Sequence, residues 1–222
     1  MTTLHIGAVV ERPPGPKYAE ALAYAELAPR APLPRPKTLA KVPRTLPDDF
    51  VLNLTAPPSC TTSKAGSLRM NDELRKSIEW LGGAAQALGA RAIVVPTASD
   101  VRTGPRDRDR LIAYFEALQE AAPGVQLAWE PGGLWEAEDA RPFADELGLI
   151  YAFDPLEVQA TPAQAAYFRV RGIGARSRLG EGTLTAVVDA IEALGEPETV
   201  YVSLISPRSV RAATRLRQLV AL

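Results

Sequence analysis

The sequence predicts an α/β protein whose parallel strands close into a TIM-like (β/α)8 barrel, with an abbreviated and proline-rich first third. Three observations support this prediction. Short apolar runs bounded by turn residues recur along the chain, helix-like patterns separate them, and a length of 222 residues suits one such barrel. We find no internal repeat and no low-complexity linker, so we expect a single domain over residues 1–222.

About eight apolar runs qualify as strands. They are rich in Val, Ile, Leu and aromatic residues and show little polar alternation, which suits strands buried on both faces. The clearest runs lie at residues 4–10, 50–54, 92–95, 125–129, 149–153, 167–170 and 200–204, and a weaker one lies at 24–28.

The strongest helix prediction covers residues 71–88. Leu74, Ile78 and Leu81 are spaced along one helical face, and Gly89 follows as a stop signal. Similar patterns occupy residues 106–122, 136–147, 182–194 and 209–220. Each of these helices except the last leads into the next predicted strand, as a crossover helix would.

Residues 11–47 are the exception to this regular alternation. Many of the 20 prolines of the chain gather in this stretch, and proline interrupts both helices and strands. We therefore expect the first two βα units to be abbreviated.

The composition excludes several classes of protein. The chain has no uninterrupted apolar run long enough for a membrane span, and its 25 basic and 26 acidic residues nearly balance, so neither a membrane nor a nucleic acid is an expected partner. The first residues lack the pattern of a secretory signal, which predicts a soluble, cytoplasmic protein. The single cysteine agrees with a reducing compartment, and no organic cofactor motif is present.

Several segments, in order along nearly the whole chain, resemble the YecE-like family (domain of unknown function 72). The segment Leu127-Ala-Trp-Glu-Pro-Gly-Gly-Leu-Trp135 is similar to a family strand that ends in Glu-Phe-Arg-His and is followed by Trp. Glu130 and Trp135 match this pattern, whereas the Arg and His do not. Residues 150–154 look like a family strand that ends in Asp, and Phe168-Arg-Val-Arg-Gly172 is similar to Arg-Leu-His-Gly, with Arg171 in place of His.

The resemblance is weaker at the two ends of the chain. Residues 24–27 look like Val-Glu-Ile of the family, but the Asn-Ser-Thr-Phe-Tyr segment that should follow is absent. Residues 200–205 occupy the place of a strand that ends in Phe-Asn-Asn, and those asparagines are missing. The resemblance implies a divergent, shortened member with a barrel related to the TIM type, and it carries over no activity.

Chemistry in such a barrel is built at the carboxyl ends of the strands. Glu26, Glu130, Asp154 and Arg169 lie at or near four predicted strand ends, where their side chains would converge. The carboxylates are candidate catalytic acids and bases and could also hold a divalent cation, while the arginine could clamp an anion. The alternative is an internal ion-pair network at the rim of the barrel.

Two further residues are candidates for substrate binding. Arg171 opens the segment 171–182, whose glycines and Arg176 and Arg178 follow the seventh predicted strand, a frequent place for phosphate sites in TIM barrels. The alternative for this segment is a solvated loop. Trp135 could form the wall of a pocket, or it could serve packing alone.

The scarcity of histidine restricts the mechanism. His5 and Cys60 are the only residues of their types, so neither a histidine-rich metal site nor a Ser-His-Asp triad can form within one chain. We expect His5 to line a strand near the amino-terminal face and Cys60 to be inert.

Three functional hypotheses remain open. The first is a small-molecule enzyme that acts on an anionic or hydroxylated metabolite, with Glu130 as acid or base and Arg169 as clamp. The second is a non-catalytic barrel that binds a ligand or partner with a degenerate family site. The third, a metal-dependent phosphodiester hydrolase, rests on fold analogy alone.

Overall fold

The computed structural model describes residues 2–172, 174 and 178–221. Eight parallel strands among these residues close into a barrel in the order β1-β10-β9-β8-β7-β6-β3-β2. The predicted fold class is therefore confirmed. The barrel strands are β1 (Thr3–Val10), β2 (Tyr24–Leu27), β3 (Val51–Thr55), β6 (Ala92–Pro96), β7 (Gln126–Glu130), β8 (Ile150–Phe153), β9 (Ala165–Arg171) and β10 (Thr199–Ile205).

The helices follow the strands as the sequence pattern predicts, with ends that differ by at most two residues. The long ones are α3 (Asp72–Leu88), α4 (Pro105–Ala121), α5 (Ala137–Glu146), α6 (Glu181–Glu192) and α7 (Ser209–Val220). Asn71 caps the start of helix α3, because its side chain accepts a hydrogen bond from the Leu74 amide at 2.8 Å, and Gly89, with φ of 59°, follows the last residue of the helix.

The first third is abbreviated, as expected from its prolines. Its helices are only the short α1 (Pro16–Ala21) and α2 (Pro36–Leu39), together with the 3-10 turn η1 (Pro43–Thr45). The loop after β3 contains a second 3-10 turn, η2 (Pro58–Cys60), and a small antiparallel hairpin of β4 (Thr62–Ser63) and β5 (Gly66–Ser67). The sequence pattern did not predict this hairpin, because two-residue strands carry no periodicity.

The chain divides into two compact units. The first contains residues 1–27, 45–51 and 152–222, and the second contains residues 28–44 and 52–151. The expectation of a single domain stays a prediction.

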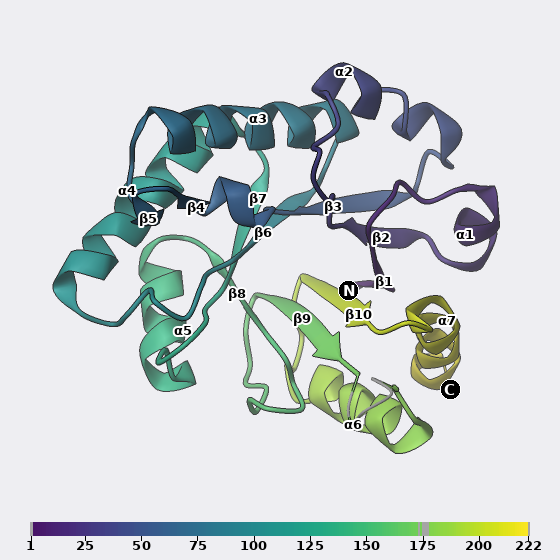
Figure 1. Ribbon diagram of the computed structural model, residues 1–222. Coiled ribbons are helices and arrows are strands. Elements are labelled where there is room, and N and C mark those ends of the chain that lie inside the picture. Colours follow the sequence, from purple (N-terminus) through teal and green to yellow (C-terminus); the bar gives the residue numbers. More distant parts are fainter. Residues whose placement is uncertain (1, 173, 175–177, 222) are drawn as a thin grey trace. The chain divides into compact units, whose positions relative to one another are not determined.

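In the first unit, β1 pairs with β2 on one side and β10 on the other, and β10 pairs with β9. Helix α7 packs on β1 and β10, and α6 packs beside α7 (Figure 1). This unit positions the buried side chains of Glu26, Asp154 and Arg169.

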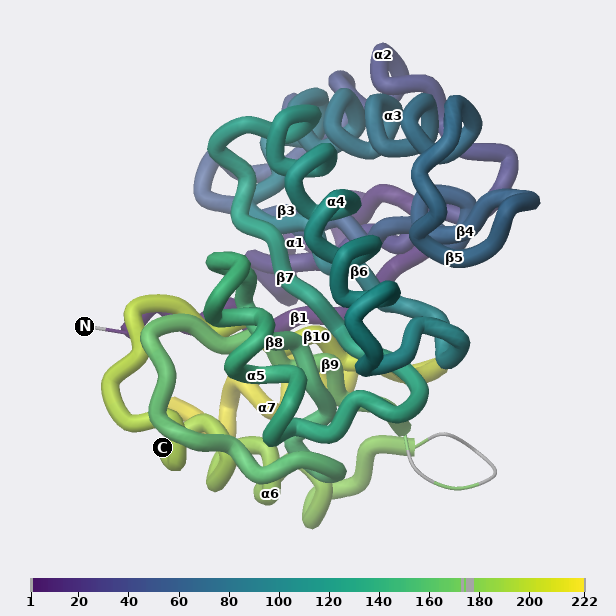
Figure 2. The backbone as a smooth tube through the Cα atoms, turned by 90° about the vertical axis from the view of Figure 1, so that its left-hand side faces the viewer, coloured from purple at the N-terminus to yellow at the C-terminus, as the bar shows by residue number. Residues whose placement is uncertain are grey.

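In the second unit, β6 pairs with β3 and β7. Helices α3 and α4 lie side by side (Figure 2), and α2 packs on α3. The core of this unit contains Trp129, Tyr114 and the leucines of α3.

Candidate functional site

Strands β2 and β9 each carry two polar side chains on one face. Tyr24 and Glu26 on β2, like Tyr167 and Arg169 on β9, are two residues apart, and this spacing directs both side chains of a pair to the same side of the sheet. Arg169 Nη2 donates to Glu26 Oε1 at 2.7 Å, and their side chains are 6% and 0% exposed. The structure thus brings two of the predicted site residues together in a buried ion pair.

Hydroxyl groups extend this pair into a chain of hydrogen bonds. The Tyr167 hydroxyl donates to Glu26 Oε2 at 2.8 Å, and the Tyr24 hydroxyl lies 3.1 Å from that of Tyr167 and 2.8 Å from Ser203 Oγ. Burial, and next the charge of Glu26, raise the pKa of Tyr167 well above its usual value. The Tyr167 hydroxyl therefore keeps its proton and donates a hydrogen bond to the carboxylate.

Aromatic rings pack beside this network. His5 stacks on Tyr201 with ring centres 5.1 Å apart, and Tyr201 also contacts Tyr24 and Tyr167. His5 is only half-buried and lies near the start of β1. Its position agrees with the packing role expected from the sequence.

Asp154 lies directly after β8, and backbone amides hold both of its oxygens. The Leu156 amide donates to Oδ1 at 3.1 Å, and the Arg171 amide donates to Oδ2 at 2.8 Å. Burial raises the pKa of Asp154 from 3.8, although these two hydrogen bonds lower it. The carboxylate therefore connects the loop after β8 to the end of β9, where the Arg171 residue is exposed.

Glu130 and Trp135 lie in the second unit. Trp129 packs edge-to-face against Trp135 and Phe143 of α5, so the alternation of side chains along β7 directs Glu130 to the opposite face of the sheet. Glu130 is 7% exposed, and its carbonyl accepts a hydrogen bond from the Thr97 amide. Its place at the carboxyl end of β7 is the one that the sequence predicted.

Trp135 is enclosed by other side chains. Its ring stacks on Phe143, the Arg108 guanidinium lies 5.1 Å from its centre, and its Nε1 donates to the Val101 carbonyl at 3.1 Å. These contacts explain the presence of Trp135 by a packing role. Its role in substrate binding stays a prediction.

The remaining predicted residues are distributed as follows. Cys60 is buried, and burial raises the pKa of its thiol to about 12, which agrees with an inert cysteine. Arg178 is exposed and precedes α6 in the chain, whereas Arg176 lies outside the described residues.

Sequence reasoning missed the hydroxyl groups of Tyr24, Tyr167 and Ser203. The signal was present for the two tyrosines, because each precedes a charged candidate by two positions on a predicted strand. Ser203 offered no such signal, since Ile205 rather than a charged candidate follows it by two positions.

Two features are absent from the described residues. These residues contain no group of three or more His, Cys, Asp or Glu side chains that could hold a metal ion. None of their helices combines the length and the apolar character that a membrane crossing requires.

No protein-family model and no curated protein matches the chain, but solved structures share its fold. A DUF72 family protein from Enterococcus faecalis V583 has a TM-score of 0.69 at 12% identity, covering 100% of this chain and 96% of that one. A xylose isomerase domain protein from Planctomyces limnophilus gives 0.64 at 11% identity, with coverage of 100% and 95%. The IolI protein, solved with a bound zinc atom, gives 0.60 at 14% identity, with coverage of 92% and 88%.

These comparisons confirm the barrel that the resemblance to the YecE-like family (domain of unknown function 72) implied. At such low identity they show the fold alone. What the barrel binds has to be argued from its own residues.

Proposed function

We propose that the protein is a small-molecule enzyme whose substrate, an anionic or hydroxylated metabolite, is oriented by Arg169. The observation that supports this function is the buried pair of Glu26 and Arg169, joined at 2.7 Å on strands β2 and β9. A buried ion pair contributes little net stability compared with apolar residues of similar size. A barrel that needed only stability would not require these charges.

Glu26 acts in this proposal as a positioning residue. Its carboxylate is fully buried and bonded to both Arg169 and the Tyr167 hydroxyl, so it fixes the direction of the guanidinium. A planar guanidinium held in this way can bind carboxylate or phosphate oxygens, or hydroxyl groups, in a defined geometry. Glu130 stays the candidate for the general acid or base, because it lies at the carboxyl end of a barrel strand.

The fold similarity favours the same class of substrate. One of the similar structures is a xylose isomerase domain protein, and sugars are hydroxylated small molecules. We therefore choose aldoses, ketoses, sugar acids and hydroxy acids as the compounds to test.

The experiment incubates the purified protein with this panel and follows turnover by proton NMR. We expect conversion of at least one compound. With Arg169→Lys, a loss of bidentate binding should raise KM about tenfold or more while kcat changes less. Glu26→Gln should act in the same direction, and Glu130→Gln should lower kcat.

Arg110→Lys is the matched control, because Arg110 forms a partly exposed ion pair with Asp107 on α4. This variant should keep the kinetics of the unaltered protein. Equal KM values for Arg169→Lys and the unaltered protein would remove Arg169 from substrate binding. Circular dichroism of each variant distinguishes lost binding from lost folding.

A second function, a barrel that binds a ligand without turnover, is favoured by one observation. Backbone amides hold both oxygens of Asp154, which leaves this carboxylate in a structural role. Saturation-transfer NMR on the same panel tests this alternative, since binding without conversion supports it and conversion excludes it.

A further inference from the structure

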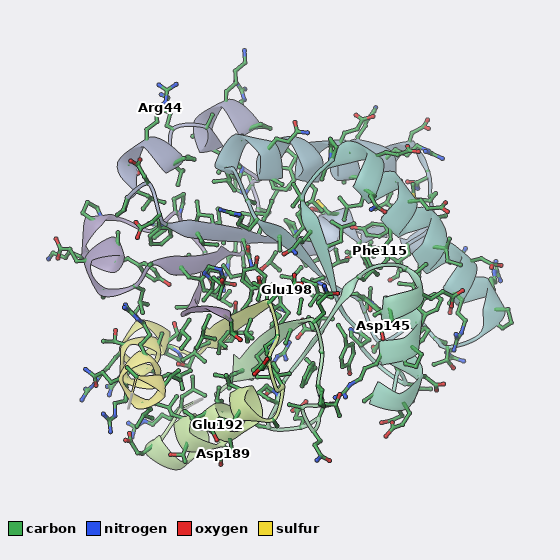
Figure 3. The ribbon with its side chains drawn as sticks, turned by 180° about the vertical axis from the view of Figure 1, so that it is seen from behind. Arg44, Phe115, Asp145, Asp189, Glu192 and Glu198 are labelled. Carbon is green, nitrogen blue, oxygen red and sulfur yellow. The ribbon has the colours of Figure 1, made fainter. Side chains whose placement is uncertain are left out.

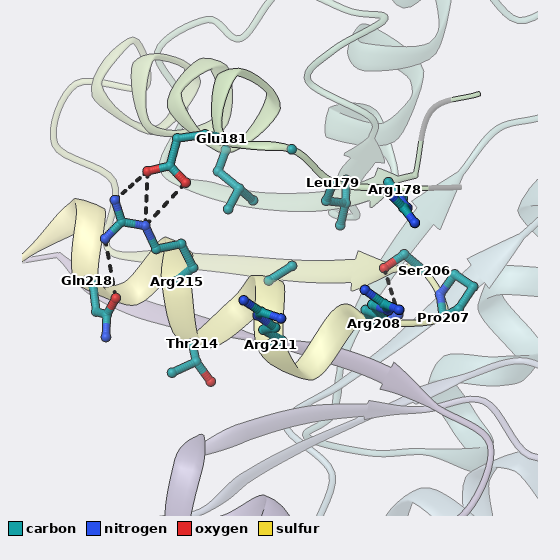
Figure 4. A pocket seen from close by; sticks show the side chains of 13 residues that line it. Arg178, Leu179, Glu181, Ser206, Pro207, Arg208, Arg211, Thr214, Arg215 and Gln218 are labelled. Carbon is teal, nitrogen blue, oxygen red and sulfur yellow. Dashed lines mark hydrogen bonds and ion pairs between the residues drawn. The ribbon is translucent and has the colours of Figure 1, made fainter. Parts of the chain in front are cut away.

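Helices α6 and α7 border a cavity of about 840 Å³ (Figure 4). It lies where the chain leaves the carboxyl ends of β9 and β10 and enters these two helices. The polar residues that matter for the argument are Arg178, Glu181, Ser206, Arg208, Arg211 and Arg215. We call this cavity the arginine groove.

The arginine groove carries an excess of positive charge. Four arginines line it, and Glu181 is the acidic residue among its lining residues. Glu181 forms an ion pair with Arg215, which also donates to Gln218 at 3.3 Å. Within residues 2–172, 174 and 178–221, no carboxylate forms an ion pair with Arg178, Arg208 or Arg211.

Two of these arginines, Arg208 and Arg211, lie at the amino-terminal end of α7, where a helix disfavours positive charge. Arg208 precedes the first residue of α7 and Arg211 lies in its first turn, which contains no acidic residue. The amino-terminal end of a helix carries partial positive charge and favours anions over cations. A bound anion would relieve both this unfavourable interaction and the repulsion among the arginines.

The size of the arginine groove indicates the kind of anion. Small-molecule sites commonly enclose about 300–1,000 Å³, and this cavity falls within that range. A nucleic acid would instead require a long basic surface, whereas the formal charge of this chain is −1. The dimensions therefore fit a compact ligand.

We propose that the arginine groove binds the phosphate groups of a small phosphorylated metabolite. Arg178, Arg208 and Arg211 would donate to the phosphate oxygens, because guanidinium groups bind phosphate through paired, charge-assisted hydrogen bonds. Arg215 stays paired with Glu181 at the other end of the groove. This site is separate from the Glu26–Arg169 pair and does not depend on the function proposed above.

The test measures binding of inorganic pyrophosphate by isothermal titration calorimetry at constant ionic strength. The unaltered protein should bind it saturably. A variant carrying Arg208→Ala and Arg211→Ala should bind it about tenfold or more weakly, since it loses two charged donors. Arg169→Lys should bind pyrophosphate as tightly as the unaltered protein, which separates this proposal from the previous one.

The matched control carries Arg44→Ala (Figure 3) and Arg75→Ala, which removes the same charge from two exposed positions in the other unit. Its affinity for pyrophosphate should stay within about twofold, because neither residue lines the arginine groove and salt screens exposed charges that do not contact the ligand. Absence of saturable binding, or an equal loss in the control, would overturn the proposal. Tighter binding of an oligothymidylate that displaces pyrophosphate would overturn it in favour of a nucleic-acid surface.

Discussion

Glu26 and Arg169 carry opposite charges in a place that water scarcely reaches. Removal of one partner from such a pair leaves an uncompensated buried charge and costs about 3–5 kcal/mol of stability, whereas the pair as a whole is close to neutral. The tyrosine hydroxyl that donates to Glu26 adds a third fixed group. The network therefore holds one geometry, and a defined direction for Arg169 is the property that substrate orientation requires.

Asp154 allows a prediction about pH. Burial raises its pKa in the folded protein, so the folded state holds the proton more tightly than the unfolded chain does. The stability from this group is present in full below about pH 4 and is lost as pH rises through the raised pKa of the folded state. The unfolding free energy of the unaltered protein, minus that of Asp154→Asn, should therefore fall as pH rises from about 4 and then level off.

Urea unfolding at a series of pH values measures this difference. Asp145→Asn is the control, because it removes an exposed carboxylate on α5 (Figure 3). Its effect on the unfolding free energy shows how much of the pH dependence arises without burial. A difference that instead grows with pH would mean that the two backbone hydrogen bonds, rather than burial, decide the pKa of Asp154.

For single residues, the sequence predicted the position of a side chain on its strand better than its hydrogen-bond partners. The placement of Glu26 and Arg169 at strand ends followed from the apolar pattern, and strand alternation then directed them to one face. The contact of the Asp154 oxygens with two amides depended on a turn and on the register of β8 and β9, which local sequence does not encode.

Among the elements, α3 shows how two adjacent glycines can have opposite effects. A methyl group added at Gly82 would clash with the backbone carbonyl of Ala121, the last residue of α4. A methyl group at Gly83 would meet only the Pro36 ring, at an ordinary distance of 3.7 Å. Gly82 therefore permits the close approach of α3 and α4, and Gly83 does not contribute to it.

Alanine substitutions at these two glycines should therefore change the unfolding free energy in opposite directions. Gly83→Ala should stabilise the protein by about 0.5–1 kcal/mol, because alanine loses less conformational freedom than glycine in a helix. Gly82→Ala should destabilise it by about 1–3 kcal/mol, the usual cost of overpacking. Urea denaturation measures both, and stabilisation by Gly82→Ala would show that α3 and α4 are not packed as closely as described.

The elements themselves were predicted to different degrees. Helix α3 was evident, because its apolar face and its glycine stop agree. The β4–β5 hairpin was missed, since its pairing depends on a turn between two-residue strands. The prolines in the first third predicted short elements, but they did not predict the residues at which these elements begin and end.

For the whole molecule, the closed strand order has a consequence for folding. Any subset of the eight strands would end in edges with unpaired backbone amides and carbonyls, which favour wrong pairing. The sequence predicted a closed barrel of parallel strands, because alternating strands and helices permit few other arrangements. The division of the chain into two units was not predicted, since it depends on contacts between distant segments.

We predict that the two units unfold together in a single transition, as one domain would. The three tryptophans, Trp80, Trp129 and Trp135, all belong to the second unit, so their fluorescence reports the unfolding of that unit alone. Far-UV circular dichroism reports the helices and strands of both units. In equilibrium urea unfolding the two signals should therefore share one midpoint and one slope. A dichroism transition without a fluorescence counterpart would identify residues 1–27, 45–51 and 152–222 as a separately folding domain, and hydrogen exchange of the β9 and β10 amides would then show the same separate midpoint.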